Sequence, residues 1–156
     1  MSKKTSIILT SVALGLSVLG FLIMAFPLFA EGITKFSQYN LLKLIKSPNW
    51  HEILIGGACL ITIISVALLV ISLCLTLLTK LNVIKVSNKI NLVLYIVNTS
   101  LSVLLLCSPI LLTIGSLRDI YGFKMFDIIA FGYFVHAVVC VAIVALTAIN
   151  IVKNKK

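Results

Sequence analysis

The sequence predicts an all-α, polytopic membrane protein: a bundle of four transmembrane helices built as two hairpins. Three observations lead to this fold class. The chain of 156 residues is 61% hydrophobic and only 11% charged, whereas soluble domains are about half apolar and about a quarter charged. The apolar residues form four long runs, and the lysines gather between alternate runs. A soluble fold of this size would leave much apolar surface in water, so lipid is the expected solvent.

Each apolar run is long enough to cross a bilayer, whose hydrocarbon core of about 30 Å needs about 20 helical residues. Backbone groups in lipid must bond within their own segment, so these runs should be helices. We expect one membrane domain, with spans at residues 6–30, 53–79, 90–117 and 128–152. The first run could alternatively be a secretory signal, but the apolar part of a signal has only about 7–15 residues. We therefore expect it to remain as a span.

The lysines predict the orientation. All four acids and five basic residues lie in the two loops after the first and third spans, at residues 31–52 and 118–127. The opposite side carries eight lysines and no acid: Lys3, Lys4, Lys80, Lys85, Lys89, Lys153, Lys155 and Lys156. Unopposed positive charge marks the cytoplasmic side. Both termini and the inner loop at 80–89 are therefore expected in the cytoplasm.

The first outer loop, residues 31–52, should contain a short helix that lies on the outer membrane interface. Leu41, Leu44 and Ile45 have helical spacing, with lysines between them, as in interfacial amphipathic helices. Ser47 followed by Pro48 is typical of an N-cap and a first helical residue. The second helix should therefore begin before its apolar part.

Three aromatic residues are expected to anchor the outer face at headgroup depth. Trp50 and Tyr39 belong to the first outer loop, and Tyr121 belongs to the second, at residues 118–127. Tryptophan and tyrosine are enriched in such interfacial belts. In the second loop, Asp127 is placed to cap the last helix.

A polar site inside the membrane is the sharpest functional candidate. His136 is the one acid–base side chain, thiols aside, deep in a span, and an intramembrane ionisable group suggests function. The alternative is a neutral histidine bonded to a Ser or Thr of a neighbouring helix. Asn98, Thr99 and Ser102 form the most polar patch of any span. They could line a solute path or hydrogen-bond across helices.

Small residues mark candidate surfaces for helix packing. Ser11 and Gly15 are four residues apart in the first span, with Gly20 beyond them, and Gly56 and Gly57 are adjacent in the second. Such residues let helix backbones approach closely. The partner helix could belong to this chain or to another protein.

No cofactor or metal is predicted. The four cysteines, Cys59, Cys74, Cys107 and Cys140, all lie in apolar runs without the spacing of a zinc or redox motif. We expect them to act as small packing residues, with a Cys59–Cys107 bridge as the alternative. The sequence also lacks the motifs of zinc proteases, serine hydrolases and phosphate-binding loops.

The expected function is therefore non-enzymatic. The leading hypothesis is a small integral membrane protein of the cell membrane that acts through helix–helix interaction, as an accessory subunit or an immunity-type envelope protein. Its partners would be the bilayer and another membrane protein or a second copy, not nucleic acid. The second hypothesis is a small oligomeric transporter or channel that uses the Asn98 patch and His136. Pro27 and Pro109 each precede a tyrosine by twelve residues, which suggests a weak repeat of the kind found in transporters.

A membrane enzyme that acts on lipid is a third hypothesis, and it requires these polar groups to converge. The excess of lysine over arginine and the many Ile and Asn residues are typical of an AT-rich bacterial genome.

Overall fold

The computed structural model describes residues 3–31, 34–117, 119–120, 123–124 and 130–154. Most of these residues are helical, and four helices are long and apolar enough to cross a membrane. They are α1 (Lys3–Ile23), α3 (Trp50–Lys80), α4 (Asn88–Ser116) and α5 (Phe131–Asn154). The prediction of four helices with membrane-spanning length is therefore confirmed.

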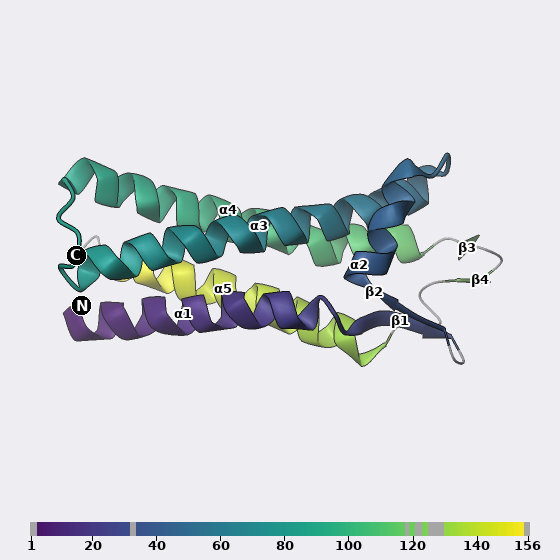
Figure 1. Ribbon diagram of the computed structural model, residues 1–156, viewed down its shortest axis with the longest axis horizontal. Helices are drawn as coiled ribbons and strands as arrows, with labels where there is room; N and C mark the ends of the chain where they lie inside the picture. The colour runs from purple at the N-terminus through teal and green to yellow at the C-terminus, as the bar shows by residue number, and fades with distance from the viewer. Residues whose placement is uncertain (1–2, 32–33, 118, 121–122, 125–129, 155–156) are drawn as a thin grey trace.

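The four long helices form a bundle in which each packs against two others. α3 contacts α1 and α4, and α5 contacts α4 and α1, so the first and last helices are neighbours. Both termini and the α3–α4 connection lie at one end of the bundle, and the short strands lie at the other (Figure 1). We call these the terminal end and the strand end.

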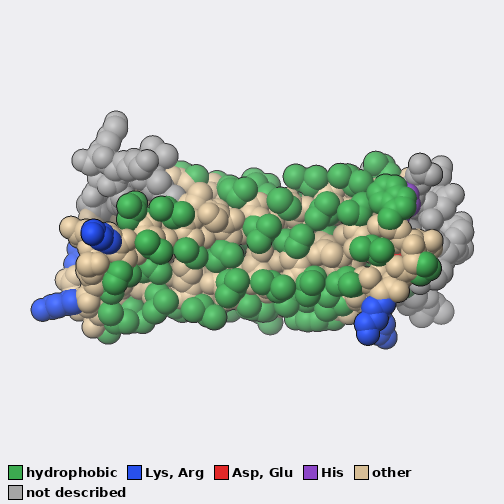
Figure 2. Space-filling view, turned by 90° about the horizontal axis from the view of Figure 1, so that it is seen from above, with side chains coloured by type: hydrophobic (Ala, Val, Ile, Leu, Met, Phe, Trp, Pro, Cys, Tyr) green, Lys and Arg blue, Asp and Glu red, His purple; other side chains and the backbone are tan. Residues whose placement is uncertain are grey.

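The outside of the bundle is apolar along its length. Large side chains such as Leu22, Ile71 and Ile96 are more than half exposed. Figure 2 shows hydrophobic side chains over the long middle of one face, with lysines near the two ends. With about 1.5 Å of rise per residue, the 31 residues of α3 extend about 46 Å, beyond a hydrocarbon core of about 30 Å. The surface fits a lipid environment.

The first span is shorter than predicted, because α1 ends at Ile23 rather than near Ala30. Pro27 then begins strand β1 (Pro27–Glu31), which pairs with β2 (Thr34–Ser37) in an antiparallel hairpin. Proline disfavours helical geometry in the residue before it. Leu28 and Phe29, both fully buried, are apolar because they pack against protein rather than lipid.

The predicted short helix of the outer loop is present as α2 (Gln38–Leu41) and the 3-10 helix η1 (Leu42–Lys46). It packs on the strand end of α3: a Cβ added at Gly56 would lie 2.5 Å from the Ile45 backbone nitrogen. Leu41 is buried with Leu28, Phe29, Ile55, Ala58, Cys59 and Leu112. This segment therefore covers the bundle instead of only lying on lipid.

The start of α3 differs from the predicted cap by two residues. Asn49 is the N-cap, and Ser47 instead accepts a hydrogen bond from the Asn49 backbone N–H at 3.1 Å. The Asn49 side chain donates to Glu52 Oε1 at 3.0 Å. Glu52 lies in the first turn of α3 and is buried; the sequence put it at the end of the outer loop, just ahead of the apolar part of this helix.

The second outer loop contains two short paired strands, β3 (Asp119–Ile120) and β4 (Phe123–Lys124). These strands and the β1–β2 hairpin were not predicted. The expected anchor Tyr121 and the expected cap Asp127 lie outside the described residues. Beyond them, the Ala130 backbone N–H bonds to the Leu28 carbonyl at 2.8 Å, which ties the start of α5 to β1.

Candidate functional site: a polar bundle interior

The helix faces that meet inside the bundle carry many small and polar residues among their apolar ones. Residues buried along α1 recur at alternating intervals of four and three: Ser6, Thr10, Ala13, Ser17 and Gly20. Those of α4 include Asn98, Ser102, Leu105, Ser108 and Leu112. This is the interval of a coiled-coil seam. In lipid, where apolar side chains gain little from burial between helices, small and polar residues favour helix contact.

A polar cluster at the terminal end joins three helices through Ser6, Thr10, Lys80 and Asn150. The Asn150 amide donates to Thr10 Oγ1 at 3.0 Å and accepts from Ser6 Oγ at 3.0 Å. Lys80 Nζ donates to Thr10 Oγ1 at 2.6 Å, to Asn150 Oδ1 at 3.2 Å and to the Ser6 carbonyl at 3.3 Å. The last residue of α3 is thereby fastened to α1 and α5.

Lys80 is held by neutral acceptors. Its ammonium has three donors, which are matched by the three bonds above, and it lies 5.3 Å from the centroid of the Tyr95 ring. Glu52 is 28 residues earlier on the same helix, about 42 Å along the axis. Within the described residues no carboxylate pairs with Lys80, so none of these residues neutralises its charge.

A central polar cluster contains Asn98, Ser102, Thr76 and Thr147. Asn98 Nδ2 donates to Thr76 Oγ1 of α3 at 2.9 Å. Ser102 accepts from Thr147 Oγ1 of α5 at 3.1 Å, and its own hydroxyl donates to the Asn98 carbonyl. The predicted Asn98 patch thus binds α4 to both of its neighbours. Thr99 bonds to the Tyr95 carbonyl of its own helix.

A third cluster lies nearer the strand end and contains His136, Ser108, Thr62 and Cys140. His136 Nε2 is 3.2 Å from Ser108 Oγ, which also shares a short hydrogen bond with Thr62 Oγ1. The Cys140 sulfur is 3.8 Å from both ring nitrogens. His136 thus has a serine of a neighbouring helix as its partner. We call these three groups the terminal, central and strand-end clusters.

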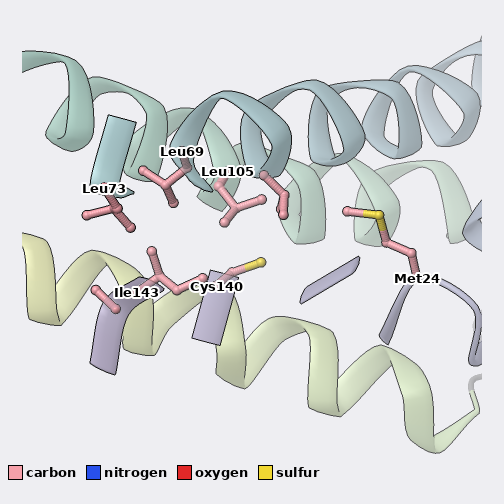
Figure 3. Packing of buried hydrophobic residues seen from close by; sticks show 8 residues of the cluster. Met24, Leu69, Leu73, Leu105, Cys140 and Ile143 are labelled. Atoms are coloured by element: carbon pink, nitrogen blue, oxygen red, sulfur yellow. The ribbon is translucent and has the colours of Figure 1, made fainter. Parts of the chain in front are cut away.

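An apolar layer separates the strand-end cluster from the central one. Leu69 and Leu73 of α3, Leu105 of α4 and Ile143 of α5 are buried together, and their side chains point toward one another in Figure 3. On α3, α4 and α5 these residues come between members of the two clusters. Asn98 and His136 are therefore parts of separate clusters rather than one site.

The predicted packing residues divide into two groups. Gly20 is buried, and a Cβ added there would lie 3.6 Å from a Val66 methyl, so it serves α1–α3 packing. Gly56 is covered by η1. Ser11 and Gly15 instead face away from the bundle, and a Cβ at Gly15 or Gly57 would meet nothing within 4 Å.

Trp50 and Tyr39 are 58% and 47% exposed near the strand end, as interfacial anchors would be. All four cysteines are free, so the alternative of a Cys59–Cys107 bridge is wrong here. Cys59 and Cys140 are buried among packing residues.

The sequence interpretation missed most partners in the three clusters, notably Lys80, Asn150 and Thr147. Lys80 was assigned to the inner loop, and the isolated Ser, Thr and Asn residues in the spans were not identified as candidate site residues. For α1 a signal was present in the spacing of its small and polar residues: Ser6, Thr10, Ala13, Ser17 and Gly20 recur at the alternating intervals of four and three that are typical of a coiled-coil seam.

Neither a metal centre nor a family assignment emerges. Among the described residues, no group of three or more His, Cys, Asp or Glu side chains could hold a metal ion. No protein-family model, curated protein or solved structure gives a match to this chain. We therefore infer function from the geometry of the bundle itself.

Proposed function

We propose that this chain is a non-enzymatic membrane protein that acts by docking its outward α1 face against a helix of another membrane protein or of a second copy. Its orientation in the proposal has both termini and the α3–α4 connection in the cytoplasm, so that the chain forms two hairpins. The eight lysines without acids on that side support this orientation.

The supporting observation is Gly15. Glycine inside a helix costs about 1 kcal/mol relative to alanine, and Gly15 has no neighbour in the bundle that would require its small size. With Ser11 one turn away and also exposed, it forms a small-xxx-small surface. Such a surface allows two helices to approach closely in lipid, and a partner helix would supply the missing contact.

The internal packing makes this face available. α1 uses a different set of small residues, including Ala13, Ser17 and Gly20, for contact with its own neighbours. Ser11 and Gly15 therefore do not need to turn inward for the bundle to form. A partner can be added without rearrangement of the monomer.

The test compares two small-to-large substitutions on exposed helix faces. Gly15→Leu should weaken association at least tenfold, about 1.4 kcal/mol, because leucine holds the helices apart. Ala145→Leu, on the exposed face of α5, is the matched control and should leave association unchanged. Association is measured by resonance energy transfer between labelled copies in liposomes and by co-purification of a stoichiometric partner in mild detergent.

Equal association in both variants, together with recovery of a solitary monomer from the native membrane, would contradict the proposal. Both variants must first show the wild-type unfolding midpoint. With an unchanged midpoint, weaker association can be attributed to lost docking rather than to lost folding.

A second candidate, a small oligomeric transporter or channel, is favoured by one arrangement. Polar clusters lie on both sides of the apolar layer formed by Leu69, Leu73, Leu105 and Ile143, and apolar constrictions can gate a polar path by excluding water. Flux of protons, ions or small solutes into liposomes, raised by Leu105→Ser and abolished by His136→Ala, would support it. Liposomes that remain tight with all three proteins exclude it.

A further inference from the structure

Two adjoining polar cavities lie at the terminal end of the bundle. One, of about 390 Å³, is lined by Thr79, Asn82, Ile84, Lys85, Val86 and Asn91. The other, of about 180 Å³, is lined by Lys3, Thr79, Lys80, Asn82, Asn91 and Tyr95. They share Thr79, Asn82 and Asn91, so they form one continuous surface between the ends of α1, α3 and α4. We call this surface the basic recess.

The charge of the basic recess is positive. Lys3, Lys80 and Lys85 contribute three ammonium groups, and no acid is among its lining residues. The charge of Lys80 is not neutralised by any carboxylate of the described residues. The asparagine amides at Asn82 and Asn91 add uncharged donors, which suit the oxygens of a phosphate group.

The backbone adds to the same field. Lys3 lies in the first turn of α1 and Asn91 in the first turn of α4, so two helix N-termini border the recess. Helix N-termini carry partial positive charge, which favours anions, although the Ile90 and Asn91 N–H groups of α4 already bond to Ser87. These partial charges add to the positive charge of the lysines and would not by themselves make an anion site.

The surroundings of the recess favour an amphiphile over a soluble anion. Leu81, Val83 and Ile84 of the α3–α4 connection are 49%, 68% and 39% exposed, as expected for a loop that dips into the membrane interface. On α4, Leu92, Val93 and Ile96 form an exposed apolar strip that begins beside Asn91. A lipid whose headgroup lies in the recess would place its acyl chains along this strip.

We propose that the basic recess binds the phosphate headgroup of an anionic phospholipid. Basic pockets between transmembrane helices on the cytoplasmic side bind such lipids in other proteins. The bound lipid would neutralise the charge of Lys80 and cover the joint between α1, α3 and α4. This inference is independent of the proposed docking face on α1.

The experiment measures lipid binding to the full chain in a neutral detergent by native mass spectrometry. Dioleoylphosphatidylglycerol should bind at least tenfold more tightly than dioleoylphosphatidylcholine. The double variant Lys3→Gln/Lys85→Gln should bind it about 25-fold more weakly, since each lysine near an anionic headgroup contributes about fivefold. Lys43→Gln/Lys46→Gln, at exposed positions of η1, is the matched control and should change binding less than twofold.

Three results would overturn the proposal: equal binding of the two lipids, equal loss in the two double variants, or displacement of the anionic lipid by millimolar inorganic phosphate. The last would identify a site for a soluble anion. Both double variants change exposed side chains, and their unfolding midpoints without lipid should match the wild type.

Discussion

The terminal cluster contains a lysine, whereas the strand-end cluster is built on His136 without a lysine, an arginine or a carboxylate. Both clusters tie neighbouring helices together through serine and threonine hydroxyl groups, to which the terminal cluster adds the Asn150 amide. Their positions differ: Lys80 is the last residue of α3, and His136 is five residues into α5. The charge of Lys80 lies at the end of a helix, where lipid headgroups and water can solvate it. The strand-end cluster, deeper in the bundle, uses only uncharged hydrogen bonds.

This comparison predicts that the terminal cluster stabilises the bundle more than the strand-end cluster does. Asn150→Ala should have the largest effect, a loss of about 3 kcal/mol, because it removes hydrogen bonds to Ser6, Thr10 and the Lys80 ammonium. The measurement is reversible unfolding in mixed micelles of detergent and denaturing surfactant. Asn88→Ala, at an exposed position, is the control, and an equal effect of both changes would refute the prediction.

His136→Leu should have a smaller effect, about 0.6 kcal/mol, the usual value for a hydrogen bond between membrane helices. Leucine keeps most of the volume of histidine, so the loss of the Ser108 bond dominates. The same unfolding assay applies, with Val138→Leu on the exposed face of α5 as the control. A loss larger than that of Asn150→Ala would reverse the order of the two clusters.

The sequence predicted the number and approximate limits of the long helices, because hydrophobic length is a local property of the chain. It could not predict where the first span ends. Leu28 and Phe29 continue the apolar run, but they are buried against protein in β1, and hydropathy does not distinguish a protein interior from lipid. The β1–β2 hairpin depends on pairing and packing that no local pattern specifies.

The candidate site was predicted only in part. Asn98, Ser102 and His136 were identified as polar residues in spans, but their partners Thr76, Thr147 and Ser108 depend on which helices are neighbours. The same difficulty applies to glycines: Gly15 and Gly20 look alike in the sequence, yet only Gly20 packs inside the bundle. The interval of small residues along α1 indicated which face turns inward, and it was the one signal available without the structure.

Two buried serines of α3 allow a test of what the helix contacts require from small polar residues: their small size or their hydroxyl groups. Ser65 and Ser72 lie on the same face of α3 as Thr62 and Thr76, which bond to α4. Both serines are buried, and neither hydroxyl has a hydrogen-bond partner among the residues that the structure describes. Unlike Ser102, which bonds to Asn98 and Thr147, they contribute little more than a small volume.

If size is the reason, Ser65→Ala and Ser72→Ala should change the unfolding free energy by less than about 0.5 kcal/mol, or raise it, because each removes an unsatisfied polar group. Ser65→Leu should cost about 1–3 kcal/mol by overpacking the α3–α4 seam. Ser102→Ala is the matched control and should cost about 0.6 kcal/mol through its lost interhelical bond. A loss at Ser65→Ala as large as that at Ser102→Ala would mean that the hydroxyl groups, rather than the close approach of the helices, hold this seam together.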